Sequence, residues 1–237
     1  MKPEKKILPD AASLIDAATQ TVVASARSAI AKRGVFHIAL AGGSTPKGLY
    51  QKLATPEYAG KIDWARVHIY FGDERCVLPT HEDSNYKMAK ESMLDHVPVP
   101  EENIHRYMTE NGVAPDVAKA YENTMEISLQ GAPIDLVLLG LGPDGHIASL
   151  FPDTPALDVT ETAVTSLYVE KFESWRVTMT YPTINAARQV IVFIAGEAKA
   201  AIVKDITTDA VAGLPVQRLD PEGEYYWYMD VAASAVA

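Results

Sequence analysis

The stretch IDLVLLGL at residues 134–141 is the clearest buried strand in the chain, and the turn GPDGH at residues 142–146 follows it directly. A continuous apolar run of this length, bounded by turn residues, is typical of a strand that is covered on both faces. Such strands occur mainly in parallel sheets flanked by helices. The stretch therefore predicts an α/β fold, and it places an aspartate and a histidine in the turn at the carboxyl end of a strand.

Helical and strand-like segments alternate along the rest of the chain. Further strands are expected at residues 35–40, 67–71, 163–169, 176–180, 189–195 and 225–229. Helices are expected at residues 11–32, 46–54, 84–96, 113–129, 182–187 and 197–206. This alternation predicts a mostly parallel sheet with helices on both faces. No repeat, low-complexity tract or linker divides the chain, so we expect one domain spanning residues 1–237.

The composition excludes several classes of protein. The 237 residues include 21 Lys plus Arg and 31 Asp plus Glu, a net charge of −10, which argues against a broad basic face for nucleic acid or anionic membranes. The single cysteine, Cys76, excludes an internal disulfide, and we expect it to be a packed thiol rather than a nucleophile. No stretch approaches the ~20 apolar residues of a membrane span and no export signal is visible, so a cytoplasmic protein is expected.

The loop AGGSTP at residues 41–46 follows a buried strand, and ligands of parallel sheets bind at the carboxyl ends of the strands. Gly42 and Gly43 let the backbone approach a ligand closely. We expect Ser44 or Thr45 to cap a helix that opens at the proline, and its positive end favours an anion such as phosphate. A tight turn with a capping serine is an equally weighted reading. Neither the Walker A nor the G-x-G-x-x-G spacing is present, so a dinucleotide has little support.

The strand expected at residues 67–71 is followed by Gly72, Asp73, Glu74 and Arg75. A guanidinium at this position can bind a phosphate through two parallel hydrogen bonds. A surface cluster of ion pairs is the commoner reading of such a sequence. Taken alone, these four residues therefore carry little weight.

His146 is the candidate general base among the six histidines. We expect it at the start of a helix, where the dipole disfavours the imidazolium and keeps the ring neutral. Asp144 is close enough in sequence to orient His146 or to contact a substrate. Two cations complete the set: Arg176 opens a strand, and Lys199 lies in the first turn of a helix, where a lysine opposes the dipole.

Several catalytic motifs are missing from the sequence, which narrows the chemistry. We find no G-x-S-x-G elbow, no H-E-x-x-H and no cluster of Cys and His with metal-ligand spacing. No metal is therefore expected. A single histidine beside carboxylates and a phosphate site indicates attack by water without a covalent enzyme intermediate.

Blocks of the sequence, in order and at matching spacing, resemble the 6-phosphogluconolactonase family. They are LAGGSTPKGLY (40–50), IYFGDERCVLPTHEDSNYKMAKESML (69–94), DLVLLGLGPDGHIASLFP (135–152), RVTMTYPTINAARQVIVFIAGEAKA (176–200) and the tail DPEGEYYWYMDVAAS (220–234). The resemblance implies a Rossmann-like three-layer α/β/α fold, shared with glucosamine-6-phosphate deaminases and ribose-5-phosphate isomerases. It implies hydrolysis of 6-phospho-D-glucono-1,5-lactone to 6-phospho-D-gluconate, the second step of the oxidative pentose phosphate pathway, with no cofactor.

The resemblance also suggests roles for the candidate residues. His146 would take a proton from the attacking water, and Asp144 would orient the histidine or the sugar. The expected substrate-binding and phosphate-binding set is Gly42, Gly43, Ser44, Thr45, Asp73, Arg75, Arg176 and Lys199. Which cation holds the phosphate and which lies near the lactone carbonyl is left open.

Two other functions remain as alternatives. Glucosamine-6-phosphate deaminases typically carry an acidic residue shortly after this histidine, whereas here no acid follows until Asp153. A non-catalytic sugar-phosphate sensor usually has a DNA-binding segment, and residues 1–32 predict one helix and no helix-turn-helix. The oligomeric state is left open, with a monomer favoured.

Overall fold

Six parallel strands form the main sheet of the computed structural model, which describes residues 2–208 and 210–234; residues 1, 209 and 235–237 of the expected 1–237 unit lie outside this description. The strand order is β1-β9-β8-β5-β2-β3. Their bounds are β1 (Glu4–Leu8), β2 (Phe36–Leu40), β3 (Val67–Phe71), β5 (Leu136–Gly140), β8 (Gln189–Ile194) and β9 (Glu224–Asp230). Every pairing between these strands is parallel. The prediction of an α/β fold with a mostly parallel sheet is thus confirmed.

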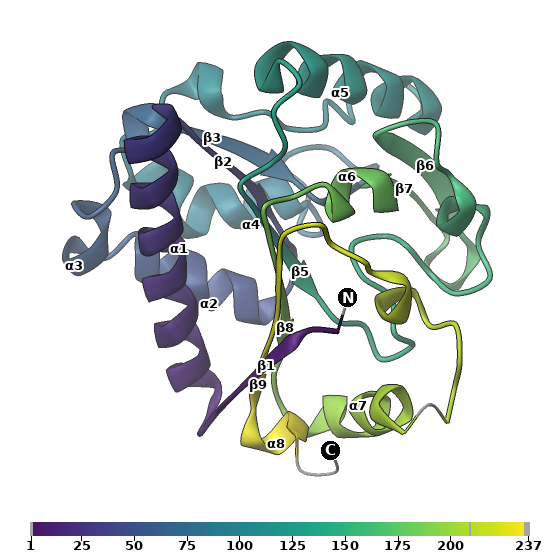
Figure 1. The fold of residues 1–237 in the computed structure, drawn as a ribbon. Coiled ribbons are helices and arrows are strands. Elements are labelled where there is room, and N and C mark those ends of the chain that lie inside the picture. Colours follow the sequence, from purple (N-terminus) through teal and green to yellow (C-terminus); the bar gives the residue numbers. More distant parts are fainter. Residues whose placement is uncertain (1, 209, 235–237) are drawn as a thin grey trace.

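Helices cover both faces of the main sheet, which makes three layers (Figure 1). On one face lie α1 (Ala11–Arg33) and α2 (Ser44–Leu53), and on the other lie α5 (Ala114–Leu129) and α6 (Tyr181–Asn185). The remaining helices are α3 (Pro56–Ala59), α4 (Asn85–Ser92), α7 (Ala200–Thr207) and α8 (Val231–Ser234). None of the helices described is long and apolar enough to cross a membrane.

The central strands explain why the apolar runs are continuous. Leu136, Val137 and Leu138 of β5 are fully buried, and so are Val190 and Ile191 of β8. Because helices cover both faces, alternate side chains of each strand enter apolar layers on opposite sides of the sheet. These two strands therefore form the middle of the core and hold the loops at their carboxyl ends in place.

A second, three-stranded sheet is antiparallel and has the order β4-β7-β6. Its strands are β4 (Asp73–Arg75), β7 (Ser174–Met179) and β6 (Val164–Val169). Gly72 joins the two sheets, because its amide donates to Leu40 O at 2.9 Å and its carbonyl accepts from the amide of Met179 at 2.8 Å. The chain therefore passes straight from β3 into the small sheet.

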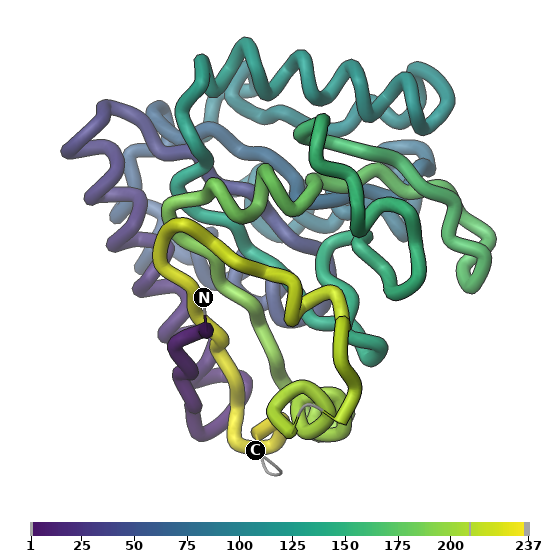
Figure 2. Tube along the Cα trace, turned by 45° about the vertical axis from the view of Figure 1, so that its right-hand side comes forward, coloured from purple at the N-terminus to yellow at the C-terminus, as the bar shows by residue number. Residues whose placement is uncertain are grey.

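Strand β1 was not predicted, and its place explains why. Among the described residues it is an edge strand paired only with β9, so the first and last strands of the chain run side by side (Figure 2). Three of its five residues are exposed, so the sequence EKKIL shows no apolar pattern. An exposed edge strand gives little hydrophobic signal, and charged side chains are common there.

Candidate functional site

A cavity of about 240 Å³ lies at the carboxyl ends of β2, β3 and β5. It is the position at which parallel α/β sheets bind ligands. Six of the predicted site residues line it: Gly42, Gly43, Asp73, Arg75, His146 and Lys199. The loops that the sequence singled out after three different strands thus lie around one cavity.

A larger hollow of about 680 Å³ lies at the opposite ends of the strands, along α1. Most of its charged side chains already have polar partners. Asp135 accepts from Arg33 at 2.5 Å and lies 3.3 Å from Arg188. Lys6 donates to the hydroxyl of Tyr228 at 3.1 Å. Side chains that are already paired in this way are not free to bind or activate a ligand, so the smaller cavity is the candidate site.

The imidazole of His146 is held by Asp144. Nδ1 of the ring lies 2.5 Å from Oδ1 of the carboxylate, and the His146 amide lies 3.4 Å from the same oxygen. Burial tends to raise the pKa of Asp144, but its hydrogen bond to His146 and the charge of that ring outweigh burial, so the pKa lies below its usual value. An ionised carboxylate only accepts hydrogen bonds, which fixes the proton of the neutral ring on Nδ1. Nε2 is then the nitrogen that can take a proton.

The expected helix after His146 is absent from the described structure, and that prediction was wrong. The segment 142–150 is a series of turns, in which the Gly142 amide donates to His146 O at 2.8 Å and the Gly145 amide donates to Gly142 O at 3.1 Å. Gly145 and Ala148 have positive φ values of 77° and 47°, which no α-helix tolerates. No helix dipole acts on the ring, and the hydrogen bond to Asp144 fixes its tautomer and orientation.

Two neighbours fix the plane of the His146 ring. The ring of Phe151 lies 4.2 Å from it, centroid to centroid, at an angle of 32°. On the backbone side, Gly142 makes room for it: a Cβ atom at this position would lie 2.0 Å from Nδ1 of His146. Only glycine fits here, because the imidazole rests directly against the backbone.

The glycine loop leads into helix α2, but the capping differs from the prediction. Gly43 is the N-cap, with φ 101°, and no side chain caps the helix. Ser44 and Thr45 instead form the first turn of α2, beside the cavity but not among the residues that line it. The first amides of a helix have no partner within the helix, so this end of α2 remains available to an anion.

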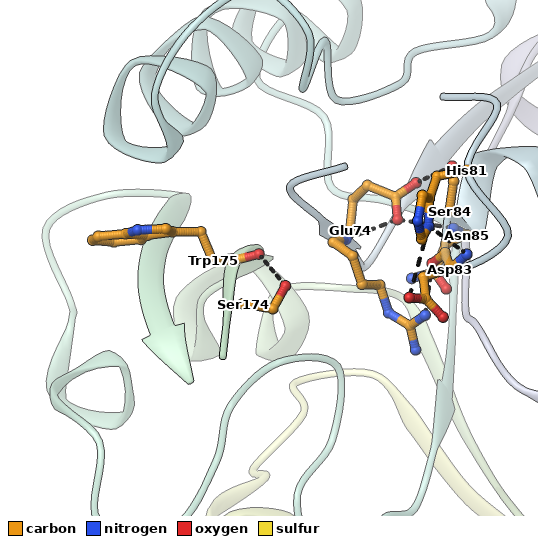
Figure 3. A network of polar contacts seen from close by, with 8 residues as sticks. Glu74, His81, Asp83, Ser84, Asn85, Ser174 and Trp175 are labelled. Atoms are coloured by element: carbon orange, nitrogen blue, oxygen red, sulfur yellow. Dashed lines mark hydrogen bonds and ion pairs between the residues drawn. The ribbon is translucent and has the colours of Figure 1, made fainter. Parts of the chain in front are cut away.

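Asp73 and Glu74 are buried and connect three segments of the chain, and Figure 3 shows Glu74 beside Ser84 and Asn85. Asp73 is 7% exposed and accepts from the hydroxyl of Ser149 at 2.6 Å and from Nδ2 of Asn85 at 3.3 Å. Glu74 is 3% exposed and accepts from the amides of Asn85 and Tyr86, each at 2.8 Å. These carboxylates therefore anchor the start of α4 to β4 and to the turn that follows β5.

Arg75 and Arg176 lie opposite each other in the small sheet. Residues paired in this way in an antiparallel ladder point to the same face. Nε of each guanidinium is buried and has no hydrogen-bond partner among the described residues, and no described carboxylate forms an ion pair with either. Burial lowers the pKa of Arg176, and the charge of Arg75 lowers it further. The charges of Asp73, Asp83 and Glu74 act in the opposite direction. Two adjacent cations that have no ion-pair partner among the described residues form a site suited to an anion.

Lys199 lies on a 3₁₀ turn, Glu197–Lys199, that leads into α7, close to its predicted place in the first turn of a helix. Burial lowers the pKa of its ammonium group, and the charge of Asp144 acts in the opposite direction. Lys199 thus lines the cavity within electrostatic range of the His146–Asp144 pair.

Sequence reasoning did not single out Asn85 and Ala148 among the residues of the cavity wall. The first is Asn85, which stands against Gly42: a Cβ atom at that glycine would lie 2.2 Å from Oδ1 of Asn85. The sequence signal for Asn85 was its place beside Ser84 in the second block (69–94) that resembles the family. The second is Ala148, whose φ is positive; an alanine in a sequence gives no sign of such a backbone conformation.

Cys76 follows β4 and remains a packed thiol. It is half-buried, and burial together with the charge of Glu74 raises the pKa of its thiol to about 11. A thiol in this state is a poor nucleophile at neutral pH. Within the described ranges, no group of three or more His, Cys, Asp or Glu residues could hold a metal ion.

Known proteins match this chain over nearly its full length. The family model for glucosamine-6-phosphate isomerases/6-phosphogluconolactonase matches residues 9–227. A 6-phosphogluconolactonase from a Nostoc species is 41% identical, with 99% of this chain and 98% of that protein aligned. One from a Synechocystis species is 39% identical, with 98% of each chain aligned.

Solved structures agree with these relatives. The 6-phosphogluconolactonase of Trypanosoma cruzi superimposes with a TM-score of 0.87 and 29% identity, covering 99% of this chain and 96% of that one. A monomeric glucosamine-6-phosphate deaminase shares the fold, with a TM-score of 0.82 over both full chains, but at 19% identity. The fold, the arrangement of the loops and the matches over almost all of its length show that the chain belongs to the glucosamine-6-phosphate isomerase/6-phosphogluconolactonase family.

Proposed function

We propose that this protein is a 6-phosphogluconolactonase, which hydrolyses 6-phospho-D-glucono-1,5-lactone to 6-phospho-D-gluconate in the oxidative pentose phosphate pathway. One observation carries the proposal: the cavity wall contains both a histidine oriented by a carboxylate and one of two adjacent arginines whose Nε atoms have no hydrogen-bond partner among the described residues. The first suits activation of water, and the second suits a phosphate. The relatives that align over the whole chain carry the same name.

The reaction begins with water at the base. Nε2 of His146 takes a proton from the water as its oxygen attacks C1 of the lactone, and the carbonyl oxygen becomes an oxyanion. Asp144 stabilises the imidazolium that forms. General-base assistance of this kind contributes about 10²–10⁴-fold to the rate. A δ-lactone is an activated ester, so no stronger nucleophile is needed.

Collapse of the tetrahedral intermediate breaks the bond between C1 and the ring oxygen. The imidazolium returns its proton to that oxygen, which becomes the C5 hydroxyl, and the new carboxylic acid ionises. Backbone amides of the loop at Gly42 and Gly43, with Lys199 at the same cavity, are the donors that we assign to the oxyanion. The water has then been added across one ester bond, and the histidine is ready for the next turnover.

The phosphate end of the substrate is assigned to Arg75 and Arg176, with the first turn of α2 at Ser44 and Thr45 beside it. A dianionic phosphate can accept from both guanidinium groups and relieve the repulsion between them. Asp73 is better described as an anchor for this wall, since its oxygens already accept from Ser149 and Asn85. The acidic surface of the protein is compatible with this site, because its positive charge is local.

Deamination of glucosamine 6-phosphate is the alternative within the same family. An acid shortly after the histidine typifies that reaction, and the residue of this segment that lines the cavity is Ala148. A non-catalytic sugar-phosphate module would bind the ligand without turnover. Lactone hydrolysis needs the oriented base His146 and no acid in the segment that follows it, so it fits the site better than either alternative. A cytoplasmic location is part of the proposal, because the free thiol of Cys76 suits a reducing compartment.

The test is a coupled assay with freshly generated 6-phosphogluconolactone, in which 6-phosphogluconate is measured and spontaneous hydrolysis is subtracted. We expect a rate proportional to protein concentration and lost in His146→Ala. Ammonia release from glucosamine 6-phosphate is measured in parallel. Ammonia without lactone hydrolysis would replace the proposal with a deaminase, and tight binding of 6-phosphogluconate with neither reaction would replace it with a sensor.

A further inference from the structure

The hairpin of β6 and β7 ends in a turn that leans over the candidate site. The turn, Glu170–Phe172, is a 3₁₀ turn closed by Glu173, whose amide donates to Glu170 O at 3.1 Å and whose φ is 46°. Lys171 lies 3.6 Å from Oδ2 of Asp144. The residues of the turn are exposed to solvent, but Lys171 places the turn beside Asp144 of the site.

Phe172 is the residue of this turn that contacts two parts of the site. The Cζ atom of Arg176 lies 5.5 Å from the centroid of its ring, within the range of a cation–π interaction. The centroid of the Phe151 ring lies 5.8 Å away at 57°, and Phe151 itself packs on His146. Phe172 thus contacts both the arginine that we assign to phosphate and the aromatic support of the base.

No described carboxylate forms an ion pair with Arg176, although the charges of Asp73, Asp83 and Glu74 attract its guanidinium. Its neighbour across the ladder, Arg75, repels it, and Nε is buried without a partner among the described residues. Arg75 is at least tied to the backbone, since its Nη1 donates to Asp83 O at 2.7 Å. The face of an aromatic ring is one of the few surfaces that can stabilise a guanidinium without neutralising it.

We propose that Phe172 is a positioning residue, which holds the guanidinium of Arg176 beside that of Arg75 so that the pair is ready for a phosphate. The inference rests on the proposed function, because that function supplies the phosphorylated substrate. Without the ring, repulsion drives the two cations apart, and binding must bring them together again. The cost falls on phosphate recognition, while His146 keeps its contacts with Asp144 and Phe151.

The same hairpin offers a matched control. Trp175 is 45% exposed and Phe172 is 46% exposed, so their replacement removes similarly accessible aromatic rings. Adjacent residues of a strand point to opposite faces, and Figure 3 shows Trp175 directed away from the cluster around Glu74. Its ring contacts Tyr168 at 5.6 Å, on the outer face of the hairpin.

The experiment compares Phe172→Ala with Trp175→Ala on the phosphorylated lactone and on unphosphorylated glucono-1,5-lactone. For Phe172→Ala we expect KM for the phosphorylated lactone to rise about 3- to 20-fold, the range that corresponds to a cation–π contact, with kcat changed less than about twofold. Phe172→Tyr keeps the ring face and should behave as the unmodified protein, whereas Phe172→Leu keeps apolar bulk alone and should behave as the alanine variant. Trp175→Ala should leave both substrates unaffected.

Equal losses on the two lactones, rescue by Phe172→Leu, or an unchanged KM in Phe172→Ala would each overturn the proposal. Calorimetric titration with 6-phosphogluconate separates it from the proposed function, because binding is measured without turnover. If the protein proves inactive on the lactone but Phe172→Ala still weakens 6-phosphogluconate binding, the positioning role stands while the proposed reaction falls.

Discussion

Nδ1 of His146 lies 2.5 Å from Oδ1 of Asp144, and the two residues are joined by a single residue in a tight turn. Because the carboxylate stays ionised, it orients the ring and selects the tautomer whose Nε2 is free to accept a proton. Orienter and base thus come from the same loop, so the geometry of that loop decides the activity.

Replacing either member of this pair should lower catalysis while substrate binding persists. For His146→Ala we expect kcat for lactone hydrolysis to fall by about 10²–10⁴-fold, and for Asp144→Asn by about 10–1,000-fold, because the amide neither fixes the tautomer nor stabilises the imidazolium. His96→Ala, at an exposed histidine, is the control. Turnover unchanged in His146→Ala would remove this residue from the mechanism, provided that calorimetry shows 6-phosphogluconate still bound.

Gly142 should be as necessary as the base that rests on it. A methyl group there would lie 2.0 Å from Nδ1 of His146, so Gly142→Ala must displace the ring and lengthen its bond to Asp144. We expect kcat to fall at least about tenfold, since small misplacements of a catalytic group are costly. Gly60→Ala is the matched control, because a Cβ atom at Gly60 meets nothing within 4 Å. Equal activity in the two variants would show that the ring has another place to go.

Arg176 should be useful for binding and unfavourable for stability. In Arg176→Met the repulsion with Arg75 disappears while the alkyl chain keeps its packing, so we expect the free energy of unfolding without ligand to be unchanged or higher by up to about 2 kcal/mol. Inorganic phosphate should raise the Tm of the unmodified protein but not that of the variant. Arg66→Met, which removes an exposed cation paired with Asp63, is the control. A variant that is less stable and still responds to phosphate would contradict the anion assignment.

Arg75→Ala separates the two ends of the substrate. We expect KM for the phosphorylated lactone to rise at least about tenfold, because a hydrogen bond to a charged group is worth about 1.5–3 kcal/mol. Unphosphorylated glucono-1,5-lactone lacks the group that Arg75 would hold, so its hydrolysis should change little. Hydrolysis assays with the two lactones test this assignment. Equal losses of activity on both would show that Arg75 shapes the cavity and does not bind the phosphate.

The sequence predicted the strands correctly where both of their faces are buried. Strands β5 and β8 are covered on both faces, so each of their positions selects an apolar residue and the runs stand out. Strand β1 was missed because it is an edge with three exposed residues, and β4 because its Asp73 and Glu74 look like a surface cluster although both are buried. Their burial depends on hydrogen bonds from α4, which are tertiary contacts that no local pattern reveals.

The candidate site was readable to the extent that it follows strand ends. The rule that ligands bind at the carboxyl ends of parallel strands brought the loops at Gly42, Arg75 and His146 together, and the structure places all three around one cavity. The expected helix after His146 failed, because positive φ values at Gly145 and Ala148 impose turns. The resemblance placed Arg75 and Arg176 in one binding set, but their direct pairing depends on the register of an antiparallel sheet formed by distant segments, which no local pattern shows.

A row of three histidines crosses the sheet on the side of α5, away from the candidate site. Their rings lie side by side: His37 and His68 at 5.2 Å, and His68 and His105 at 5.3 Å, with Nδ1 of His68 3.0 Å from Nε2 of His105. The hydroxyl of Tyr70 lies 3.2 Å from Nδ1 of His37 and donates to Ser128 of α5. Burial, and the neighbouring His68, lower the pKa of both His37 and His105 to about 4.

These histidines should make the protein sensitive to mild acid. Unfolded, each has a pKa near 6.5, so between pH 6.5 and 4 the unfolded chain binds protons that the folded one refuses, and stability falls as the pH falls. Asp135 opposes the shift at His37 and Arg33 adds to it. We expect a loss on the order of 1 kcal/mol per histidine between pH 7 and 5, measured by urea unfolding. His105→Gln, which retains a polar side chain, should flatten this dependence, whereas His96→Gln at an exposed site should not; parallel curves for all three proteins would show that the row does not control it.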